Sequence, residues 1–380
     1  MSALACVALL SVALLAYTYV GYPVAIGVLA RLRPIVKRRL ERADGDDGAL
    51  PRITICLPVY NGEAYLAKKL ASLFAQDYPR DKLDVIVFCD GCTDGTEALA
   101  RELAAQEAAR GGVRVDVLVG HRKGKPTALN TMSASATGDL ILLNDVRQPL
   151  APISARALAR ALDDPGVGCA TGNLVLEGDA GSGVYWRYEN WIRKQESRYR
   201  GMVGITGPIA MVRRKDLEPL PTDVILDDVW VPSRLALRGQ RVELVEEAEA
   251  RDAAFEDERE FKRKVRTLAG NYQIFSMLPG LLSPSKNPIW FETISHKILR
   301  LVAPWLLIAL MLVGLLSFVA PGGSPALRGL FLAQVAFYAL AAVGRRAGRI
   351  AGVARTFVVL NVAALVGLFK FATGKQRITW

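Results

Sequence analysis

Histidine and cysteine are scarce in this 380-residue chain, which holds two histidines and five cysteines. The cysteines are scattered and odd in number, so they cannot form a complete disulfide framework. Cys89 and Cys92 form a C-x-x-C pair, but no second Cys pair or His pair lies nearby to complete a zinc site. We therefore expect neither a disulfide scaffold nor a structural zinc.

Charge is absent from residues 2–30 and 301–320, and from the shorter runs 329–344 and 356–369. A helix that crosses a bilayer needs about 20 apolar residues, so the first two runs predict spanning helices. The first run also lacks the basic start and short core of a signal peptide. The third run spans if its flanking arginines snorkel, whereas the fourth could span, tilt or re-enter.

The distribution of charge predicts the domain organisation. We expect an N-terminal membrane helix over 1–30, a basic linker over 31–51, a soluble domain over 52–280, an interfacial connection over 281–300 and a C-terminal membrane cluster of two to three helices over 301–380. Basic residues follow the first run (Arg31, Arg33, Lys37, Arg38 and Arg39) and precede the second (Lys297 and Arg300). Positive flanks favour the cytosol, so the soluble domain is predicted to be cytosolic and the N-terminus outside.

The formal net charge of +11 does not indicate nucleic acid as a partner. Much of the excess lies at membrane edges, where anionic head groups attract it. No zinc-finger, helix-turn-helix or RNA-binding signature accompanies it. The lipid bilayer is the expected partner.

Apolar β-branched stretches alternate with helical patterns in the soluble domain. Strands are predicted over 53–59, 84–89, 113–119 and 140–143, and helices over 64–75, 96–109 and a short segment after Pro126. This alternation predicts an α/β fold with a mostly parallel sheet flanked by helices. Ligands of such sheets bind outside the carboxyl ends of the strands, so the polar residues after each strand are candidate site residues.

Six motifs occur in order along the soluble domain. They are Leu57–Glu63, Asp90–Thr96, Gly124–Lys125 with Ala128–Asn130, Asn144–Asp145, Gly207–Arg214 and Asp227–Asp228. Alone, each is weak, because a segment such as Asp90–Thr96 is also typical of a plain turn with a helix cap. Together, over residues 52–280, they resemble family 2 glycosyltransferases of the GT-A fold. The closest resemblance is to the membrane-bound branch, which includes cellulose, hyaluronan and poly-N-acetylglucosamine synthases.

The resemblance implies transfer of a sugar from a nucleotide-sugar, with UDP-sugars foremost, to a glycan or lipid-linked acceptor. The substrate-binding residues it implies are Pro58, Tyr60, Asn61, Glu63, Asp90, Lys125, Asn144, Asp145, Arg147 and Arg263. Of these, Tyr60, Glu63 and Asp90 would hold the base and ribose, and Lys125 would lie near the base or diphosphate. An inner (plasma) membrane location follows from the same resemblance.

The catalytic residues implied by the resemblance are Asp228 as general base, Asp227 beside it and Arg266 at the diphosphate and acceptor. The chemistry is consistent, because an acceptor hydroxyl needs a carboxylate base and the departing phosphate needs cations. Direct attack would invert the anomeric centre. By itself, the Asp227–Asp228 pair is more typical of a helix N-terminus, where acids are favoured by the helix dipole, and it is the upstream motifs that favour the catalytic interpretation.

Two positions depart from the family pattern. Asp145 matches the first aspartate of Asp-x-Asp, which in the family works with a divalent cation (Mg or Mn), but the second aspartate is replaced by Arg147. Metal dependence is therefore expected to be weaker, or to rest on Asp145 and the donor's phosphates. Arg147 itself would contact diphosphate or simply face solvent or head groups. The tryptophan of Gln-x-x-Arg-Trp is replaced by Thr267, which favours transfer of single sugars over processive synthesis.

The aromatic segment 184–200 leaves three alternatives open: it lies in the bilayer interface, stacks on acceptor sugars, or packs in the core. Two alternatives to the main function also stay open at this point. One is transfer of a single sugar to a polyprenyl-phosphate carrier, and the other is a non-catalytic membrane sensor or transporter.

Overall fold

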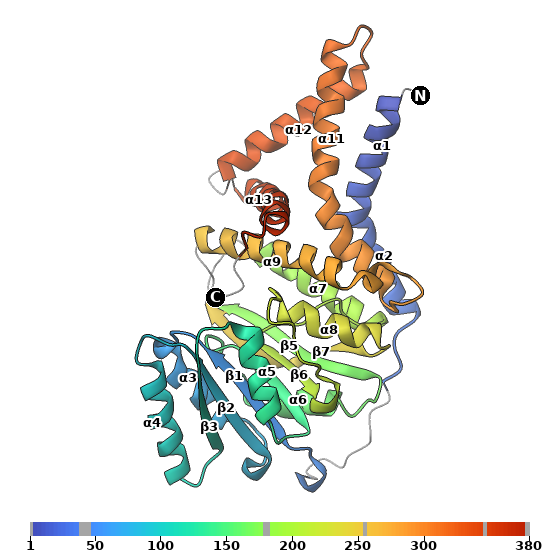
Figure 1. Cartoon of the computed structure of the whole chain (residues 1–380). Coiled ribbons are helices and arrows are strands. Elements are labelled where there is room, and N and C mark those ends of the chain that lie inside the picture. Colours follow the sequence, from blue (N-terminus) through green and yellow to red (C-terminus); the bar gives the residue numbers. More distant parts are fainter. Residues whose placement is uncertain (1–2, 38–46, 178–182, 254–256, 345–347, 377–380) are drawn as a thin grey trace.

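The computed structural model describes residues 3–37, 47–177, 183–253, 257–344 and 348–376. An α/β domain forms the lower part of the molecule in Figure 1, and long helices extend from it on one side. Helices α7 (Gly183–Tyr199) and α9 (Asp257–Met277) lie between the sheet and these long helices. Part of the predicted basic linker, including Arg38 and Arg39, lies outside the described residues.

In the described part of the chain, seven strands form one mixed sheet in the order β3-β2-β1-β4-β6-β5-β7. They are β1 (Ile53–Val59), β2 (Leu83–Asp90), β3 (Arg114–Gly120), β4 (Leu140–Asn144), β5 (Val167–Glu177), β6 (Ile209–Arg213) and β7 (Arg241–Ala253). The first four strands pair in parallel, which confirms the predicted βαβ arrangement. β6 is antiparallel to both β4 and β5, and β7 is parallel to β5.

Two hydrophobic cores cover the two faces of the sheet, because successive side chains of a strand point to opposite faces. In β1, Ile53, Ile55 and Leu57 belong to one core and Cys56 belongs to the other. The first core includes side chains of α3 (Glu63–Phe74), α4 (Thr96–Ala109) and α6 (Ser154–Ala161), and the second includes side chains of α5 (Lys125–Ser135), α8 (Asp227–Leu237) and α9.

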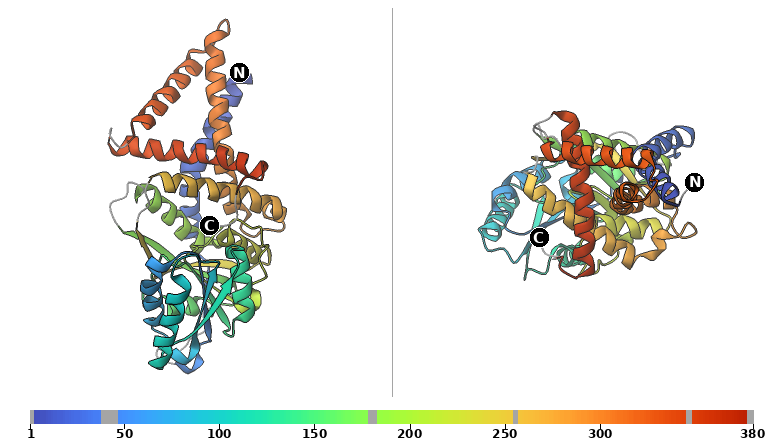
Figure 2. Two further views of the ribbon diagram at one scale, coloured as in Figure 1. Left: turned by 60° about the vertical axis from the view of Figure 1, so that its left-hand side comes forward. Right: turned by 90° about the horizontal axis from the view of Figure 1, so that it is seen from above.

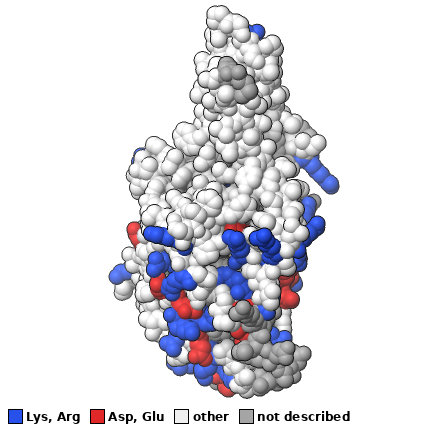
Figure 3. Space-filling model, turned by 90° about the vertical axis from the view of Figure 1, so that its right-hand side faces the viewer, with Lys and Arg blue, Asp and Glu red and all other residues white. Residues whose placement is uncertain are grey.

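Within the described residues, four helical stretches are long and apolar enough to cross a membrane. They are Ala3–Leu32 (α1, Ala3–Ala16; a π-helical turn, Tyr17–Gly21; α2, Tyr22–Leu32), Trp290–Val319 (α10, Trp290–Glu292; a π-helical turn, Thr293–Ile298; α11, Leu299–Val319), α12 (Pro325–Val343) and α13 (Arg349–Ala372). Figure 3 shows this part of the surface as almost free of charge, above a region where Lys and Arg gather. Candidate membrane helices therefore occur at both ends of the chain, as predicted.

The fourth stretch, α13, does not run alongside the other three. Both views in Figure 2 show α13 lying across the direction of α11, next to α9. α13 and α9 are in close contact at Gly367. A Cβ added at this glycine would lie only 2.9 Å from the backbone nitrogen of Ala269 in α9. By length and composition α13 is a candidate span, and its axis crosses that of α11 (Figure 2).

The aromatic segment 184–200 forms α7, which packs against the N-terminal helix. Tyr188 donates a hydrogen bond to the carbonyl of Tyr19 (2.9 Å), and Trp186 donates one to the carbonyl of Leu174 (3.1 Å). Tyr199 is buried in a cluster with Tyr22 of α2. Packing is thus the role that the structure gives to these three aromatic residues.

Candidate active site

The carboxyl ends of β1, β2 and β4 lie along one edge of the sheet and carry the predicted polar motifs. Asp90 is the last residue of β2 and is almost fully buried. Its two carboxylate oxygens accept hydrogen bonds from the backbone N–H groups of Lys123 (2.9 Å) and Gly124 (2.8 Å). Gly124 has a φ of +90°, a conformation that favours glycine. Asp90 thereby fixes the loop from which α5 and Lys125 begin.

Lys125 connects two of the predicted carboxylates. Its ammonium lies 2.8 Å from Asp145 Oδ1 and 2.9 Å from Asp227 Oδ2. Burial disfavours the charge of Lys125, but the two carboxylates outweigh burial and raise its pKa above the ordinary lysine value. A lysine that stays charged at the edge of the sheet is suited to binding phosphate.

Asp228 lies on the other side of the same small space. A Cβ added at Gly207 would lie 3.6 Å from Asp228 Oδ2 and 3.9 Å from Asp145 Oδ2, so the two carboxylates flank Gly207. Asp228 Oδ1 is buried and has no hydrogen-bond partner among the described residues. Burial, and secondly the charge of Asp227, raise the pKa of Asp228 to about 6. A carboxylate with these properties is suited to accept a proton near neutral pH.

Arg266 of α9 completes this group, and its positive charge acts on Asp228. Its Nη2 donates a hydrogen bond to the carbonyl of Ile225 at 3.1 Å, just before the Asp227–Asp228 pair. Arg263 lies one turn earlier on α9 and is exposed. The structure therefore brings together Asp90, Lys125, Asp145, Asp227, Asp228 and Arg266.

Three predicted substrate-binding residues, Tyr60, Asn61 and Glu63, shape a neighbouring loop. Asn61 adopts a φ of +46° and accepts a hydrogen bond from the backbone of Thr93 (2.9 Å). Glu63 accepts one from the backbone of Gly95 (2.9 Å). The guanidinium of Arg122 lies 3.2 Å from the ring centroid of Tyr60, so that an aromatic and a cation are stacked beside the Asp90 loop.

Two predicted site residues are held away from this group. Pro58 is a buried residue within β1, opposite Phe88 of β2. Arg147 points to Asp252 at the end of β7, with its Nη2 3.0 Å from Asp252 Oδ1. Arg147 therefore forms an ion pair with Asp252, and does not simply face solvent.

Lys69 of α3 is a site residue that the sequence analysis missed. It is fully buried, and its ammonium donates hydrogen bonds to Asn144 Oδ1 (2.7 Å) and to the carbonyl of Gln148 (2.6 Å). These residues flank the loop that carries Asp145. Burial lowers the pKa of Lys69 to about 7. In the sequence Lys69 is one of two adjacent lysines on an amphipathic helix, and nothing there distinguishes it from the exposed Lys68.

The comparisons with known proteins agree with this geometry. Residues 54–220 match the family described as Glycosyl transferase family 2. The chain contains a family 2 glycosyltransferase domain. An N-acetylglucosaminyltransferase from Rhizobium leguminosarum bv. viciae is 29% identical over 179 residues, which cover 45% of this chain and 41% of the relative. Another from Rhizobium sp. (strain N33) is 30% identical over 224 residues, which cover 57% and 46%. The chain thus spans less than half the length of these curated relatives.

A solved structure supports the GT-A-like fold of the family 2 domain together with its helices. A mannosyltransferase from Pyrobaculum calidifontis, in complex with GDP-Man and Mn2+, superimposes with a TM-score of 0.74 at 24% identity. The superposition covers 97% of this chain and 99% of the other. Within this chain, Asp90, Lys125 and Asp145 lie inside the residues that match the family, whereas Asp228 and Arg266 follow them.

The family 2 domain offers few ligands for a metal ion. Asp145 provides one carboxylate, and position 147, where a second would stand, holds an arginine. In the described part of the chain, no group of three or more His, Cys, Asp or Glu could hold a metal ion. A divalent cation therefore fits beside Asp145 only if the donor's diphosphate supplies further oxygen ligands.

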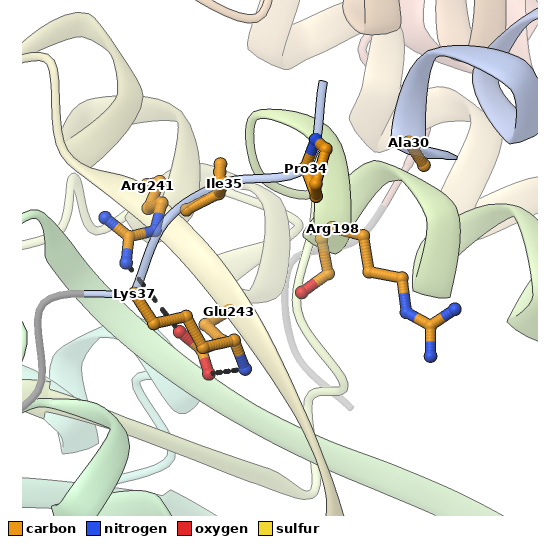
Figure 4. Close-up of a pocket in the computed structure, with 8 residues that line it drawn as sticks. Ala30, Pro34, Ile35, Lys37, Arg198, Arg241 and Glu243 are labelled. Carbon is orange, nitrogen blue, oxygen red and sulfur yellow. Dashed lines mark hydrogen bonds and ion pairs between the residues drawn. The ribbon is translucent and has the colours of Figure 1, made fainter. Parts of the chain in front are cut away.

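The pocket drawn in Figure 4 lies elsewhere. It has a volume of about 350 Å³ and is lined by residues of the α2 end, α7 and the start of β7. Its charges are paired, with Lys37 2.7 Å from Glu243. β6 is antiparallel to both β4 and β5, so β5 runs in the same direction as β4. β7 is parallel to β5 and therefore also runs in the direction of β4. The pocket is therefore at the sheet edge opposite Asp145.

Proposed function

We propose that the family 2 domain transfers a sugar from a nucleotide-sugar to a glycan or glycolipid acceptor at the membrane, with inversion and with Asp228 as general base. One observation carries the proposal. Asp228 and Asp145 lie within 4 Å of the same point at Gly207, and Lys125 joins Asp145 to the neighbouring Asp227. A proton acceptor and a phosphate-binding cation thus share one space.

Each residue has a step to perform in this proposal. Lys125 binds the donor's diphosphate and stabilises the charge that develops on it as the sugar departs. Asp228 accepts the proton of the acceptor hydroxyl as that oxygen attacks the anomeric carbon. Because the hydroxyl attacks directly, the anomeric configuration inverts and no covalent sugar–enzyme intermediate forms. Asp90 positions Lys125 through the backbone N–H groups that it binds.

A divalent cation, Mg2+ or Mn2+, belongs to the proposal as a partner of the donor. Asp145 would hold it together with diphosphate oxygens, and it would add positive charge at the leaving group. The Pyrobaculum calidifontis mannosyltransferase was solved with GDP-Man and Mn2+, and the curated relatives are N-acetylglucosaminyltransferases. The donors to test first are therefore UDP-N-acetylglucosamine, other UDP-sugars and GDP-mannose.

The test is to incubate membranes containing the full chain with each donor and follow nucleotide release and sugar transfer, with and without chelator. We expect one donor to be consumed, and Asp228→Asn to lower transfer by about 10²–10⁴-fold, the usual contribution of a general base. Asp223→Asn, which changes an exposed acid close by in sequence, is the matched control and should leave transfer unchanged. Equal transfer by Asp228→Asn and the parent would contradict the proposed base.

A further inference from the structure

The turn between α7 and β6 lies at the centre of the candidate active site. It is a β-turn that begins at Thr206 and closes with a hydrogen bond from the backbone N–H of Ile209 to the carbonyl of Thr206 (2.9 Å). Its second residue, Gly207, is flanked by Asp145 and Asp228. The position of this turn therefore decides how much room is left between the two carboxylates.

Strand β5 and helix α8 hold the backbone of the turn. The backbone N–H of Thr206 donates to the hydroxyl of Thr171 in β5 (2.9 Å), and that hydroxyl donates to the carbonyl of Ile209 (2.9 Å). The backbone N–H of Ile205 donates to the carbonyl of Asp228 in α8 (3.0 Å). Thr171 and Thr206 are both buried, so hydrogen bonds at these groups are costly to leave unmade.

The third support of the turn is a side chain of α7. Arg193 Nη2 donates a 2.6 Å hydrogen bond to the hydroxyl of Thr206. Hydrogen bonds from an ionised donor are about twice as strong as those between neutral groups. Thr206 thus joins the turn to β5 through its backbone and to α7 through its side chain. A valine at position 206 would keep the shape of the side chain and lose only the bond to α7.

Helix α7 is held in turn by both membrane stretches that meet the domain. Glu196, which follows Arg193 on α7, accepts a hydrogen bond from Tyr22 of α2 (2.6 Å). The same carboxylate lies 2.6 Å from Nδ1 of His296, at the start of the Trp290–Val319 stretch. Residues three apart are neighbours on the surface of a helix. One short part of α7 therefore contacts the membrane stretches and the turn at the active site.

We infer that Arg193 and Thr206 are positioning residues, which hold the Gly207 turn in the place that the reaction at Asp228 requires. They act through the turn and do not touch the reacting atoms. The inference rests on the proposed function and adds that the geometry of the base is set from α7. Because reacting atoms must approach to about 3–3.5 Å, a displaced turn lowers kcat, whereas donor binding at Lys125 is preserved.

The experiment measures sugar transfer and donor binding separately in the full chain. The protein is purified in detergent and reconstituted in nanodiscs made with the total lipid extract of the membranes that supported transfer, and it is supplied with the donor consumed there. The measured quantities are kcat, KM for the donor, nucleotide binding and thermal unfolding. Thr206→Val and Arg193→Met each remove one side of the hydrogen bond, and Thr206→Ser keeps the hydroxyl.

We expect Thr206→Val and Arg193→Met each to lower kcat by about tenfold or more, since a misplacement of about 1 Å can cost about 10²-fold. Donor KM and nucleotide binding should stay unchanged, and Thr206→Ser should restore kcat. The double variant should lose no more than either single variant, because both changes break the same hydrogen bond. The matched control is Lys194→Gln, since Lys194 is next to Arg193 but pairs with Glu246.

A second pair of variants tests the turn and leaves its hydrogen bonds in place. A Cβ added at Gly207 would meet its nearest neighbour at 3.6 Å, an ordinary van der Waals contact, so Gly207→Ala fits the fold but fills the room between Asp145 and Asp228. Gly204→Ala adds the same methyl group earlier in the segment, 3.8 Å from the carbonyl oxygen of Asp228. We expect Gly207→Ala to lower transfer by about tenfold or more, and Gly204→Ala to leave it unchanged.

A kcat equal to that of the parent in both Thr206→Val and Arg193→Met would overturn the inference and leave the proposed function standing. Additive losses in the double variant would overturn it as well, since the two residues would then not act through one bond. Lower thermal stability of Thr206→Val, combined with full transfer by Gly207→Ala, would mean that the turn only supports the fold. Absence of Asp228-dependent transfer in the parent would instead contradict the proposed function.

Discussion

At the scale of single residues, burial sets the protonation of the two groups on either side of Asp145. Burial raises the pKa of Asp228 to about 6, whereas burial lowers the pKa of Lys69 to about 7. The same cause acts on both, because a low-dielectric environment disfavours whichever form is charged. A base that is half-protonated near pH 6 remains a stronger proton acceptor at neutral pH than an ordinary carboxylate.

The raised pKa of Asp228 predicts the acid side of the pH profile. Since the deprotonated carboxylate is the base, kcat/KM should be half its maximum near pH 6 and fall about tenfold per unit below it. Asp227→Asn removes a negative charge that raises the pKa of Asp228, so its profile should shift to lower pH. Steady-state rates between pH 4.5 and 8 measure both, and identical acid limbs in the two proteins would contradict the assignment.

The lowered pKa of Lys69 predicts a stability difference. Between about pH 7 and its ordinary value of 10.5, Lys69 binds a proton in the unfolded chain but not in the folded one. The free energy of unfolding therefore rises with pH across this window, and the benefit is lost as pH falls to about 7. Lys69→Met should show a flatter pH dependence than the parent, measured by thermal unfolding in detergent at pH 7 and 9.

Lys69→Met should also weaken donor binding, by about tenfold in KM, because the loop that carries Asp145 loses hydrogen bonds at both of its ends. Lys68→Met changes the adjacent, exposed lysine and is the matched control for both measurements. If Lys68→Met and Lys69→Met had the same effect on unfolding and donor KM, Lys69 would not position the loop that carries Asp145.

At the scale of elements, the sequence was informative where the pattern is local. The strands β1, β2 and β4 are buried along their whole length, so they read as continuous apolar runs between helices. The positions of Asp90 and Asp145 could be predicted from the polar residues at the ends of β2 and β4, whereas Asp228 was predicted from the family resemblance alone. β7 was not predicted, because residues 245–250 (VEEAEA) have helical propensity. Its pairing with β5 outweighs that propensity.

The contributions of distant elements could not be predicted in the same way. Glu196 and His296 are separated by 100 residues, and neither belongs to one of the six motifs. Only the packing of α7 against the start of the Trp290–Val319 stretch places Glu196 2.6 Å from His296 Nδ1. Lys69 is similar, since its partners Asn144 and Gln148 lie on another element. Non-local contacts of this kind leave no periodic signal in the sequence.

The contact between α9 and α13 predicts an effect on the site from a distance. Gly367 meets α9 at Ala269, where an added Cβ would be only 2.9 Å from a backbone atom. Gly367→Val should therefore push the helices apart, at about 1–3 kcal/mol, and move Arg266, which is on α9. We expect lower stability and at least several-fold lower transfer. Val362→Leu, on the exposed side of α13, should change neither thermal unfolding nor transfer.

At the scale of the whole molecule, the arrangement of the helices suggests how the chain lies in a bilayer. The stretches Ala3–Leu32 and Trp290–Val319 run from the α/β domain to the far end of the molecule (Figure 1). α12 returns from that end, and α13 lies across the layer of α9 (Figure 2). Arg31 and Arg33 stand at the end of α2 near the domain. Because basic residues favour the cytosol, we propose that the family 2 domain is cytosolic.

This topology makes a prediction about the last helix. If α11 and α12 form a membrane hairpin and α13 lies along the cytosolic surface, the turn at Pro321 is outside and Thr373 is inside. Cysteines at Pro321, Thr373 and, as a cytosolic reference, Lys68 can be introduced one at a time into a background with Cys6→Ser and Cys92→Ser, because the other three native cysteines are buried. All three introduced positions are exposed. An impermeant maleimide should label intact cells or oriented vesicles at Pro321→Cys alone, and the other two only after permeabilisation. Labelling of Thr373→Cys from outside would mean that α13 crosses the membrane, and its contact with α9 at Gly367 would then have to be rearranged in the bilayer.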